Sequence, residues 1–135
     1  MANALYGKGR QKFLDGSISW SSDNIKAILV DTNDYTVAID TDEFLSDIPS
    51  GAREETSANL TGKTSTLGVA DSDDPVFTGA TGDQCEAVVL IKDTGSAATS
   101  PLIAYIDTAT GLPVTPNSGD ITVQWSSGAS KIFKL

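Results

Sequence analysis

The stretch Cys85-Glu86-Ala87-Val88-Val89-Leu90-Ile91-Lys92-Asp93-Thr94 is an apolar run that ends in a polar pair. Its odd-numbered positions from 85 to 91 are apolar and share one face of a strand. Val88 and Leu90 make the opposite face apolar as well. A strand with two apolar faces lies in the centre of a sheet or under a covering neighbour. The stretch therefore predicts a core strand of a β-sheet.

The same pair, Asp-Thr, ends four strand-like apolar runs of the chain. An Asp side chain accepts a hydrogen bond from the backbone two residues on, and Thr does so more weakly. The pair therefore predicts that a strand stops and a turn begins, and we expect at least three of the four aspartates to cap turns and bind no ligand. The runs are Ile28–Thr32, Val37–Thr41, Leu90–Thr94 and Ala104–Thr108.

The remaining segments predict a fold of short antiparallel strands. We expect eight to ten strands spaced by 8–12 residues, which is typical of sandwich and barrel-like domains. Residues 24–31 and 34–40 are predicted to form a hairpin, 41–49 one helical turn, and 50–58 a loop. Trp20 and Trp125 are expected in the core. The predicted class is all-β: an antiparallel β-sandwich, jelly-roll-like, with an N-terminal arm at 1–15 and one domain at 16–135.

The charge of the chain restricts its partners. The 135 residues include 18 acidic and 9 basic side chains, for a net charge of −9. An acidic protein repels nucleic acids and anionic lipids. Apolar stretches of the roughly 18 residues that a membrane span needs are absent, and the N-terminus does not resemble a signal peptide. We therefore expect no nucleic-acid or membrane partner, and a chain that stays soluble in the cytoplasm where it is made.

Few residues of this sequence suggest catalysis. It has no histidine and one cysteine, which excludes Ser-His and Cys-His nucleophiles and most zinc sites. Cys85 is expected to be a small core residue. Among the acidic clusters, Asp71-Ser72-Asp73-Asp74 is the best calcium candidate, but it lacks the glycine and the distal glutamate of an EF-hand loop, and turn chemistry explains it better. A bound cation and a glycosidase-like carboxylate pair stay open. We expect no cofactor, no metal and no enzymatic activity.

Several segments together resemble a small virion structural protein of tailed bacteriophages and prophages. The likeness runs from about residue 4 to residue 135 and contains no catalytic motif. It is carried by Leu5-Tyr6-Gly7-Lys8-Gly9-Arg10, Phe13-Leu14-Asp15-Gly16, Ile25-Lys26-Ala27-Ile28-Leu29-Val30-Asp31-Thr32, Tyr35-Thr36-Val37, Phe44-Leu45-Ser46-Asp47-Ile48-Pro49 and Leu102-Ile103-Ala104-Tyr105-Ile106-Asp107-Thr108-Ala109-Thr110-Gly111-Leu112-Pro113-Val114.

Within that group the resemblance best suits a capsid decoration, or cement, protein. Such proteins are commonly β-rich and often trimeric, and they bridge neighbouring subunits of the major capsid protein on the outside of the shell. The resemblance thus implies the major capsid protein and further copies of this chain as partners. It places the protein on the capsid exterior of the virion, assembled in the bacterial host cytoplasm. The alternatives are a neck or tail component and a fibre-associated module that binds the host surface.

The N-terminus is the first candidate for the docking surface. Four of the nine basic residues lie at positions 8, 10, 12 and 26, which makes the start of an acidic chain basic. Such a segment is either a solvated arm or an arm that docks on an acidic partner. The loops 50–58 and 107–119 are the next candidates. The predicted interface residues are Leu5, Tyr6, Lys8, Arg10 and Lys12, with Tyr6 as the apolar anchor and Lys8 and Arg10 as charge partners.

Overall fold

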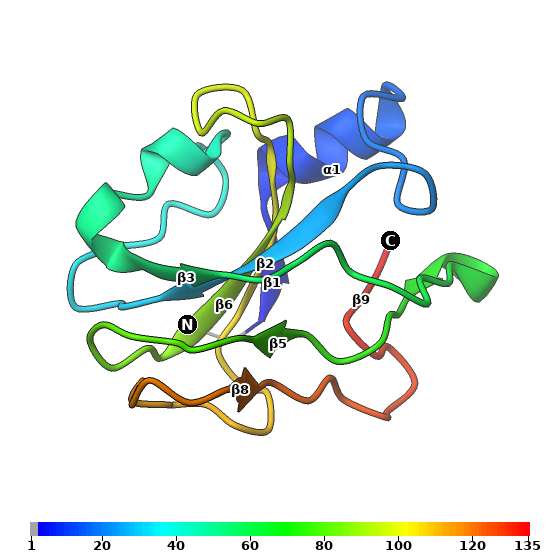
Figure 1. Cartoon of the computed structure of the whole chain (residues 1–135). Coiled ribbons are helices and arrows are strands. Elements are labelled where there is room, and N and C mark those ends of the chain that lie inside the picture. The colour runs from blue at the N-terminus through cyan, green and yellow to red at the C-terminus, as the bar shows by residue number, and fades with distance from the viewer. Residues whose placement is uncertain (1–2) are drawn as a thin grey trace.

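A five-stranded antiparallel sheet forms the centre of the protein, with the strand order β1-β7-β6-β2-β3 (Figure 1). The computed structural model describes residues 3–135. The middle strands β7, β6 and β2 are almost entirely buried, because their residues are apolar on both faces. The core strand predicted from residues 85–92 is β6, and its central position confirms the prediction. The strands are β1 (Ala4–Leu5), β2 (Ile25–Val30), β3 (Arg53–Thr56), β6 (Ala87–Lys92) and β7 (Leu102–Ile106).

Two separate hydrophobic clusters cover the two faces of this sheet. Side chains alternate along a strand, so Val88 and Leu90 join the larger cluster, whereas Val89 and Ile91 join the smaller one. Cys85 was expected to share a face with Val89, and this is wrong. It precedes β6, bonds to Val114 instead, and lies in the larger cluster.

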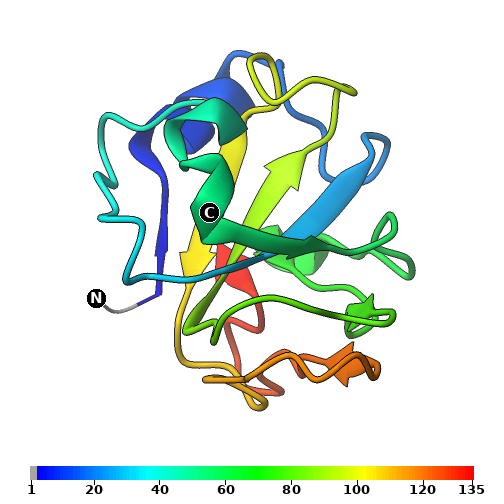
Figure 2. The same ribbon diagram turned by 60° about the vertical axis from the view of Figure 1, so that its left-hand side comes forward.

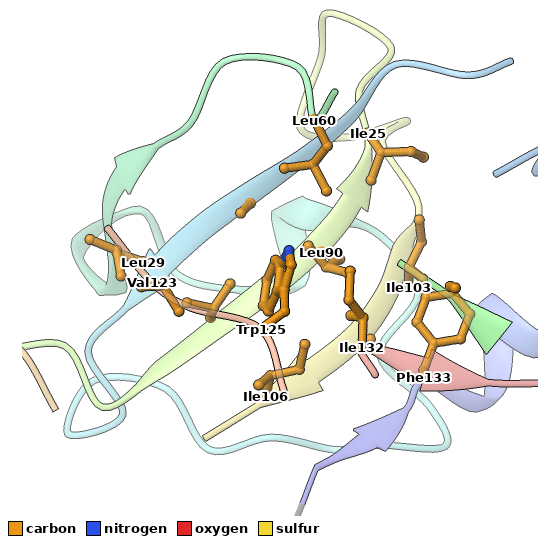
Figure 3. Packing of buried hydrophobic residues seen from close by; sticks show 14 of the residues in the cluster. Ile25, Leu29, Leu60, Leu90, Ile103, Ile106, Val123, Trp125, Ile132 and Phe133 are labelled. Atoms are coloured by element: carbon orange, nitrogen blue, oxygen red, sulfur yellow. The ribbon is translucent and has the colours of Figure 1, made fainter. Parts of the chain in front are cut away.

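Two short two-stranded β-ladders cover the larger cluster. β4 (Val69–Ala70) pairs with β9 (Phe133–Lys134), and β5 (Val76–Phe77) pairs with β8 (Ile121–Thr122). Figure 3 shows Trp125 and Phe133 facing the central strands across this core. The Trp20 ring meets Phe133 edge-on, with ring centroids 5.3 Å apart. Both tryptophans are buried, which confirms the predicted core positions.

The cover of the smaller cluster has little regular structure. Residues 35–52 cross this face and include two short 3₁₀ turns, η1 (Leu45–Asp47) and η2 (Ser50–Ala52), on the side of the sheet opposite the β5–β8 ladder (Figure 2). η1 lies within the segment predicted to be a helical turn. A third 3₁₀ turn, η3 (Thr66–Gly68), lies in the connection before β4.

The predicted hairpin of residues 24–31 and 34–40 is wrong. β2 pairs with β6 on one side and with β3 on the other, so both of its edges are already occupied. Residues 34–40 pass over the sheet face and bury Tyr35, with Val37 and Ile39 partly covered. The predicted loop 50–58 contains β3. Its charged sequence suits the edge of a sheet, where it discourages pairing with another chain.

The protein is therefore mostly β, with a five-stranded antiparallel sheet and one α-helix, α1 (Gly7–Leu14). Residues 3–135 contain nine strands, within the predicted range. Across the same residues, every helix is too short or too polar to cross a bilayer.

Two of the Asp-Thr pairs make the predicted turn bond. Asp31 and Asp93 follow β2 and β6, and their Oδ1 atoms accept hydrogen bonds from the backbone N–H groups of Asn33 and Gly95, at 2.9 and 3.0 Å. Asp40 does not follow a strand. The turn beside it is held by Asp42, whose Oδ2 accepts the N–H of Ala38 at 3.0 Å. The fourth pair follows β7 directly, as predicted.

Candidate partner-binding surface

Helix α1 packs closely against β7. The backbone N–H groups of Tyr6 and Gly7 donate to the carbonyls of Ile103 and Ile39, at 2.9 and 2.8 Å. Gly9 is buried, and a Cβ atom on it would lie 2.6 Å from the carbonyl oxygen of Leu102. Only a residue without a side chain allows this approach. Gly9 lowers the helix propensity of this segment, but the packing against β7 requires it. The contacts with the rest of the domain therefore stabilise the helix.

Tyr6 is an internal residue. Its side chain is fully buried, and its hydroxyl lies 3.0 Å from that of Tyr35, which donates to Asp42 Oδ2 at 2.6 Å. Burial raises the pKa of Tyr6 well above the ordinary value for a phenol. The pKa of Tyr35 is raised by burial and by the hydrogen bond to Asp42. Tyr6 therefore anchors the N-terminal segment to its own domain, and residues 4–14 are a packed strand and helix rather than an extended arm.

The three basic side chains of α1 differ in whether an acidic side chain of the same protein pairs with them. Lys12 is engaged internally: its Nζ lies 2.7 Å from Glu43 Oε1 and 5.2 Å from the centre of the Phe44 ring. Arg10 is exposed and makes only a loose ion pair with Asp40, at 3.8 Å. Lys8 is half-exposed and has no acidic partner within residues 3–135. Arg10 and Lys8 can therefore meet a partner.

An open apolar hollow lies beside α1, and we call it the α1–β9 groove. Its volume is about 400 Å³, and it joins the N-terminal segment to the end of β9. Leu14 and Leu135 are 90% and 60% exposed, which is unusual for large apolar side chains. Exposed apolar surface with a polar rim is typical of interaction sites. The lining residues are Leu5, Arg10, Phe13, Leu14, Lys134 and Leu135.

A second hollow continues the groove along β7. It measures about 160 Å³ and shares Leu5 and Lys134 with the first. The wall of the groove is fixed, because the rings of Phe13 and Phe133 are in contact, with centroids 5.9 Å apart. The helix and the last strand therefore form one preformed surface.

The structure brings together two of the five predicted interface residues, Leu5 and Arg10. Tyr6 and Lys12 contact the protein's own interior, and Lys8 lies on α1 outside the groove lining. The residues that the sequence reasoning missed are Phe13, Leu14, Lys134 and Leu135. The first two follow Lys12 in the same helix and could have been added. Local sequence carries no signal that places the last strand beside the first.

The other two candidate segments are built into the fold. The segment 50–58 supplies the edge strand β3, and the segment 107–119 is tied to the core through Val114, whose carbonyl accepts the Cys85 N–H at 2.8 Å. Cys85 is fully buried, as predicted. Burial, with Glu54 and Glu86 nearby, raises the pKa of its thiol to about 12. Such a thiol is a poor nucleophile.

The acidic cluster at 71–74 is occupied by internal contacts. Asp71 Oδ2 lies 3.3 Å from Lys131 Nζ, and Asp73 Oδ2 accepts the Thr61 hydroxyl at 3.1 Å. Asp74 Oδ1 accepts the backbone N–H of Trp125 at 2.9 Å. The three carboxylates thus serve three different contacts, to residues 12, 51 and 60 positions away in the sequence, and none of these contacts is the local turn bond that the sequence predicted.

A different acidic group comes together in space. Carboxylate oxygens of Asp31, Asp34 and Asp83 lie within 4.8 Å of one another. Oxygen ligands of this kind suit a hard cation such as calcium. Asp31 is buried and already caps the turn that follows β2, however, and the other two side chains are exposed. The turn accounts for the closeness of Asp31 and Asp34, since the Asp34 N–H donates to the Asp31 carbonyl at 3.2 Å, and exposed acidic groups such as Asp83 commonly lie this close without an ion.

Comparison with known proteins gives no assignment: the sequence matches no protein-family model and no curated protein.

Proposed function

We propose that this chain is a virion structural protein of a tailed bacteriophage, a capsid decoration protein that binds the outer surface of the major capsid protein shell and stabilises it. The observation that carries the proposal is the α1–β9 groove, an exposed apolar surface with basic residues on an acidic protein. The groove includes Leu5 and Arg10, two residues of the basic N-terminal segment that the charge pattern of the sequence predicts as the docking surface. No catalytic step is part of this function.

The scaffold suits a role in contact. The five-stranded sheet and the two short ladders enclose one core, and we take them as the two layers of a jelly-roll-like antiparallel sandwich. Both faces of the sheet are packed, so the backbone that carries the surface groups is held in a fixed position. Fixed positions lower the entropic cost of binding.

Stabilisation of the shell follows from mass action. A protein that binds the assembled shell but not its free subunits shifts the equilibrium towards the assembled state. We propose that the chain acts as a trimer, because linked copies raise the avidity of a modest contact without new chemistry. The net charge of −9 keeps free copies soluble, whereas Arg10 and Lys134 give the groove the opposite sign.

Two exposed leucines allow a matched test. Leu14 lines the groove and is 90% exposed, and Leu67 lies in η3, outside the groove lining, and is 91% exposed. Each is replaced by Asp, so that both variants lose an equally exposed leucine side chain and gain one negative charge. Each protein is then mixed with purified expanded shells that lack decoration and is sedimented with them. We expect the wild type and Leu67→Asp to co-sediment and Leu14→Asp to bind at least about tenfold more weakly.

Equal binding of all three proteins would show that the groove is not part of the interface. Absence of binding by the wild type would refute the decoration role. Electron-microscopic images of virions that carry a labelled copy provide the second readout. Label distributed over the shell supports decoration. Label confined to the neck or tail would contradict it.

A further inference from the structure

The α1–β9 groove is bordered by strand edges as well as by side chains. β1 is the terminal strand of the central sheet and pairs with β7 alone. β9 likewise has one strand partner, β4. One residue of each strand, Leu5 in β1 and Lys134 in β9, lines both the α1–β9 groove and the second hollow that continues it. The backbone of these two residues can therefore be considered as part of the surface.

The register shows which way the peptide groups of Leu5 point. Residues of an antiparallel strand alternate between those that bond to the partner strand and those whose N–H and C=O groups face away. Tyr6 bonds to β7, since its N–H donates to Ile103 at 2.9 Å. Leu5 stands opposite Ala104 at the intervening position. Its N–H and C=O groups thus lie on the open edge of the sheet.

The same reasoning applies to Lys134. The N–H of Leu135 donates to Gly68 on the β4 side at 3.0 Å, and Lys134 stands opposite Val69 at the intervening position. The peptide groups of Lys134 therefore face away from β4. Within residues 3–135, neither Leu5 nor Lys134 has a further hydrogen-bond partner for these groups. An unpaired edge beside an apolar hollow is a template for an added strand.

The charges of the groove indicate what kind of strand would fit. Arg10 is exposed and only loosely paired, and the Lys134 side chain is exposed and makes no ion pair within residues 3–135. Both belong to the groove lining, whereas the chain as a whole has twice as many acidic as basic residues. The remaining lining side chains are apolar. Alternating apolar and acidic residues on an extended segment would match both features.

We propose that the open edge of β1 at Leu5 binds an extended, acidic and apolar segment of a partner protein by strand addition, with Arg10 and Lys134 contacting its carboxylates. In the decoration role this segment belongs to the shell, and that part of the inference rests on the proposed function. The backbone of Leu5 supplies the register of the added strand, and the apolar wall holds its alternate side chains.

A proline at position 5 tests the role of the backbone. It removes the outward N–H of Leu5 but none of the bonds to β7, and proline is tolerated on the open side of an edge strand. Leu5→Val keeps the N–H and serves as the comparison. The probe is the blocked peptide Val-Glu-Val-Asp-Val-Thr, and a version with Lys in place of Glu and Asp is the charge control. Binding is followed by amide chemical shifts in ¹H–¹⁵N spectra of the full chain.

We expect saturable shifts of the Leu5 and Lys134 amides at peptide concentrations up to about 1 mM, and at least about tenfold weaker binding of the Lys peptide. Leu5→Val should bind the acidic peptide at least about tenfold more tightly than Leu5→Pro. If the proline variant fails to fold, the Leu5 amide shift in the wild type decides the question. Absence of saturable shifts at Leu5, or shifts that the Lys peptide reproduces, would overturn the proposal.

The peptide assay is independent of the shell assay, so the two failures can be told apart. Shell binding that Leu5→Pro leaves unchanged, together with no peptide binding, would refute strand addition and leave the decoration role standing. Peptide binding without shell binding would refute the decoration role and support the strand-addition site for another partner.

Discussion

The hydroxyl oxygens of Tyr6 and Tyr35 lie 3.0 Å apart in the interior, although 29 positions separate the two residues in the sequence. Tyr35 donates onward to Asp42 at 2.6 Å, so Tyr6 is the donor of the first bond. This chain of hydrogen bonds fastens the start of α1 to the 35–52 cover of the sheet. It therefore fixes the base of the helix that forms one wall of the α1–β9 groove.

Tyr35→Phe should destabilise the protein by about 2 kcal/mol, because it leaves the buried Tyr6 hydroxyl without a partner and removes one of the two hydrogen bonds that Asp42 Oδ2 accepts. Tyr6→Phe should cost about 1 kcal/mol, since the Tyr35–Asp42 bond survives. Urea denaturation measures both. Tyr105→Phe is the control: Tyr105 is buried, and its hydroxyl has no hydrogen bond within residues 3–135. A cost for Tyr105→Phe equal to that of Tyr35→Phe would argue against the hydrogen-bond network.

Gly9→Ala should destabilise the protein although it raises helix propensity. Propensity alone favours Ala over Gly by about 0.8–1.0 kcal/mol. The new Cβ would stand 2.6 Å from a backbone oxygen of β7, which cannot move without displacing the strand. Overpacking of this kind costs about 1–3 kcal/mol. Gly51→Ala, whose Cβ meets no atom within 4 Å, should change the free energy of unfolding by less than about 0.5 kcal/mol. Thermal or urea unfolding that shows a stabilised Gly9→Ala variant would contradict the close packing of α1.

Cys85 should be inert towards thiol reagents in the native protein. The side chain is fully buried, and its raised pKa of about 12 leaves almost no thiolate at pH 8. Reaction with a chromogenic disulfide should proceed only as fast as the protein opens, and it should be complete and rapid in guanidinium chloride. Because the folded-state pKa lies above the ordinary value near 9, the stability that the buried thiol contributes is lost as the pH rises from 9 towards 12. Rapid labelling of the native protein would show that the segment around Cys85 opens readily.

Acid should weaken the protein partly through Asp47 and Asp93. The N–H groups of Glu43 and Phe44 lower the pKa of Asp47, and Lys26 together with the N–H of Gly95 lowers that of Asp93. Since the folded-state pKa values lie below the ordinary 3.8, these contributions are present above about pH 4 and are lost as the pH falls through the lowered values. Asp47→Asn should therefore show a smaller difference in urea midpoint between pH 7 and pH 3 than the wild type does. An unchanged difference would mean that Asp47 has the same pKa in both states.

Much of the core could be predicted because its signal is local. The continuous apolar run shows that β6 is covered on both faces, and the alternation of apolar and polar residues shows that Trp20 and Trp125 point inward. Such a pattern records which side of a strand avoids water, and this depends on residues one and two positions apart. The two confirmed Asp-Thr turns are local for the same reason, since the carboxylate of Asp31 or Asp93 bonds only two residues away.

The pairing partners and the candidate site were decided by the tertiary structure. The polar segment 53–56 becomes the neighbour of β2, whereas the more strand-like residues 34–40 cover a face. Gly9 weakens a helix in isolation but is required where α1 meets β7. Leu5 and Lys134 border one groove from opposite ends of the chain. By itself, then, the sequence determined that β6 and the two tryptophans are buried and where two of the turns lie, whereas it placed the buried Tyr6 at the surface. Only the packing of the whole chain decided which segments meet, because the choice among competing partners depends on the total area buried and the hydrogen bonds satisfied.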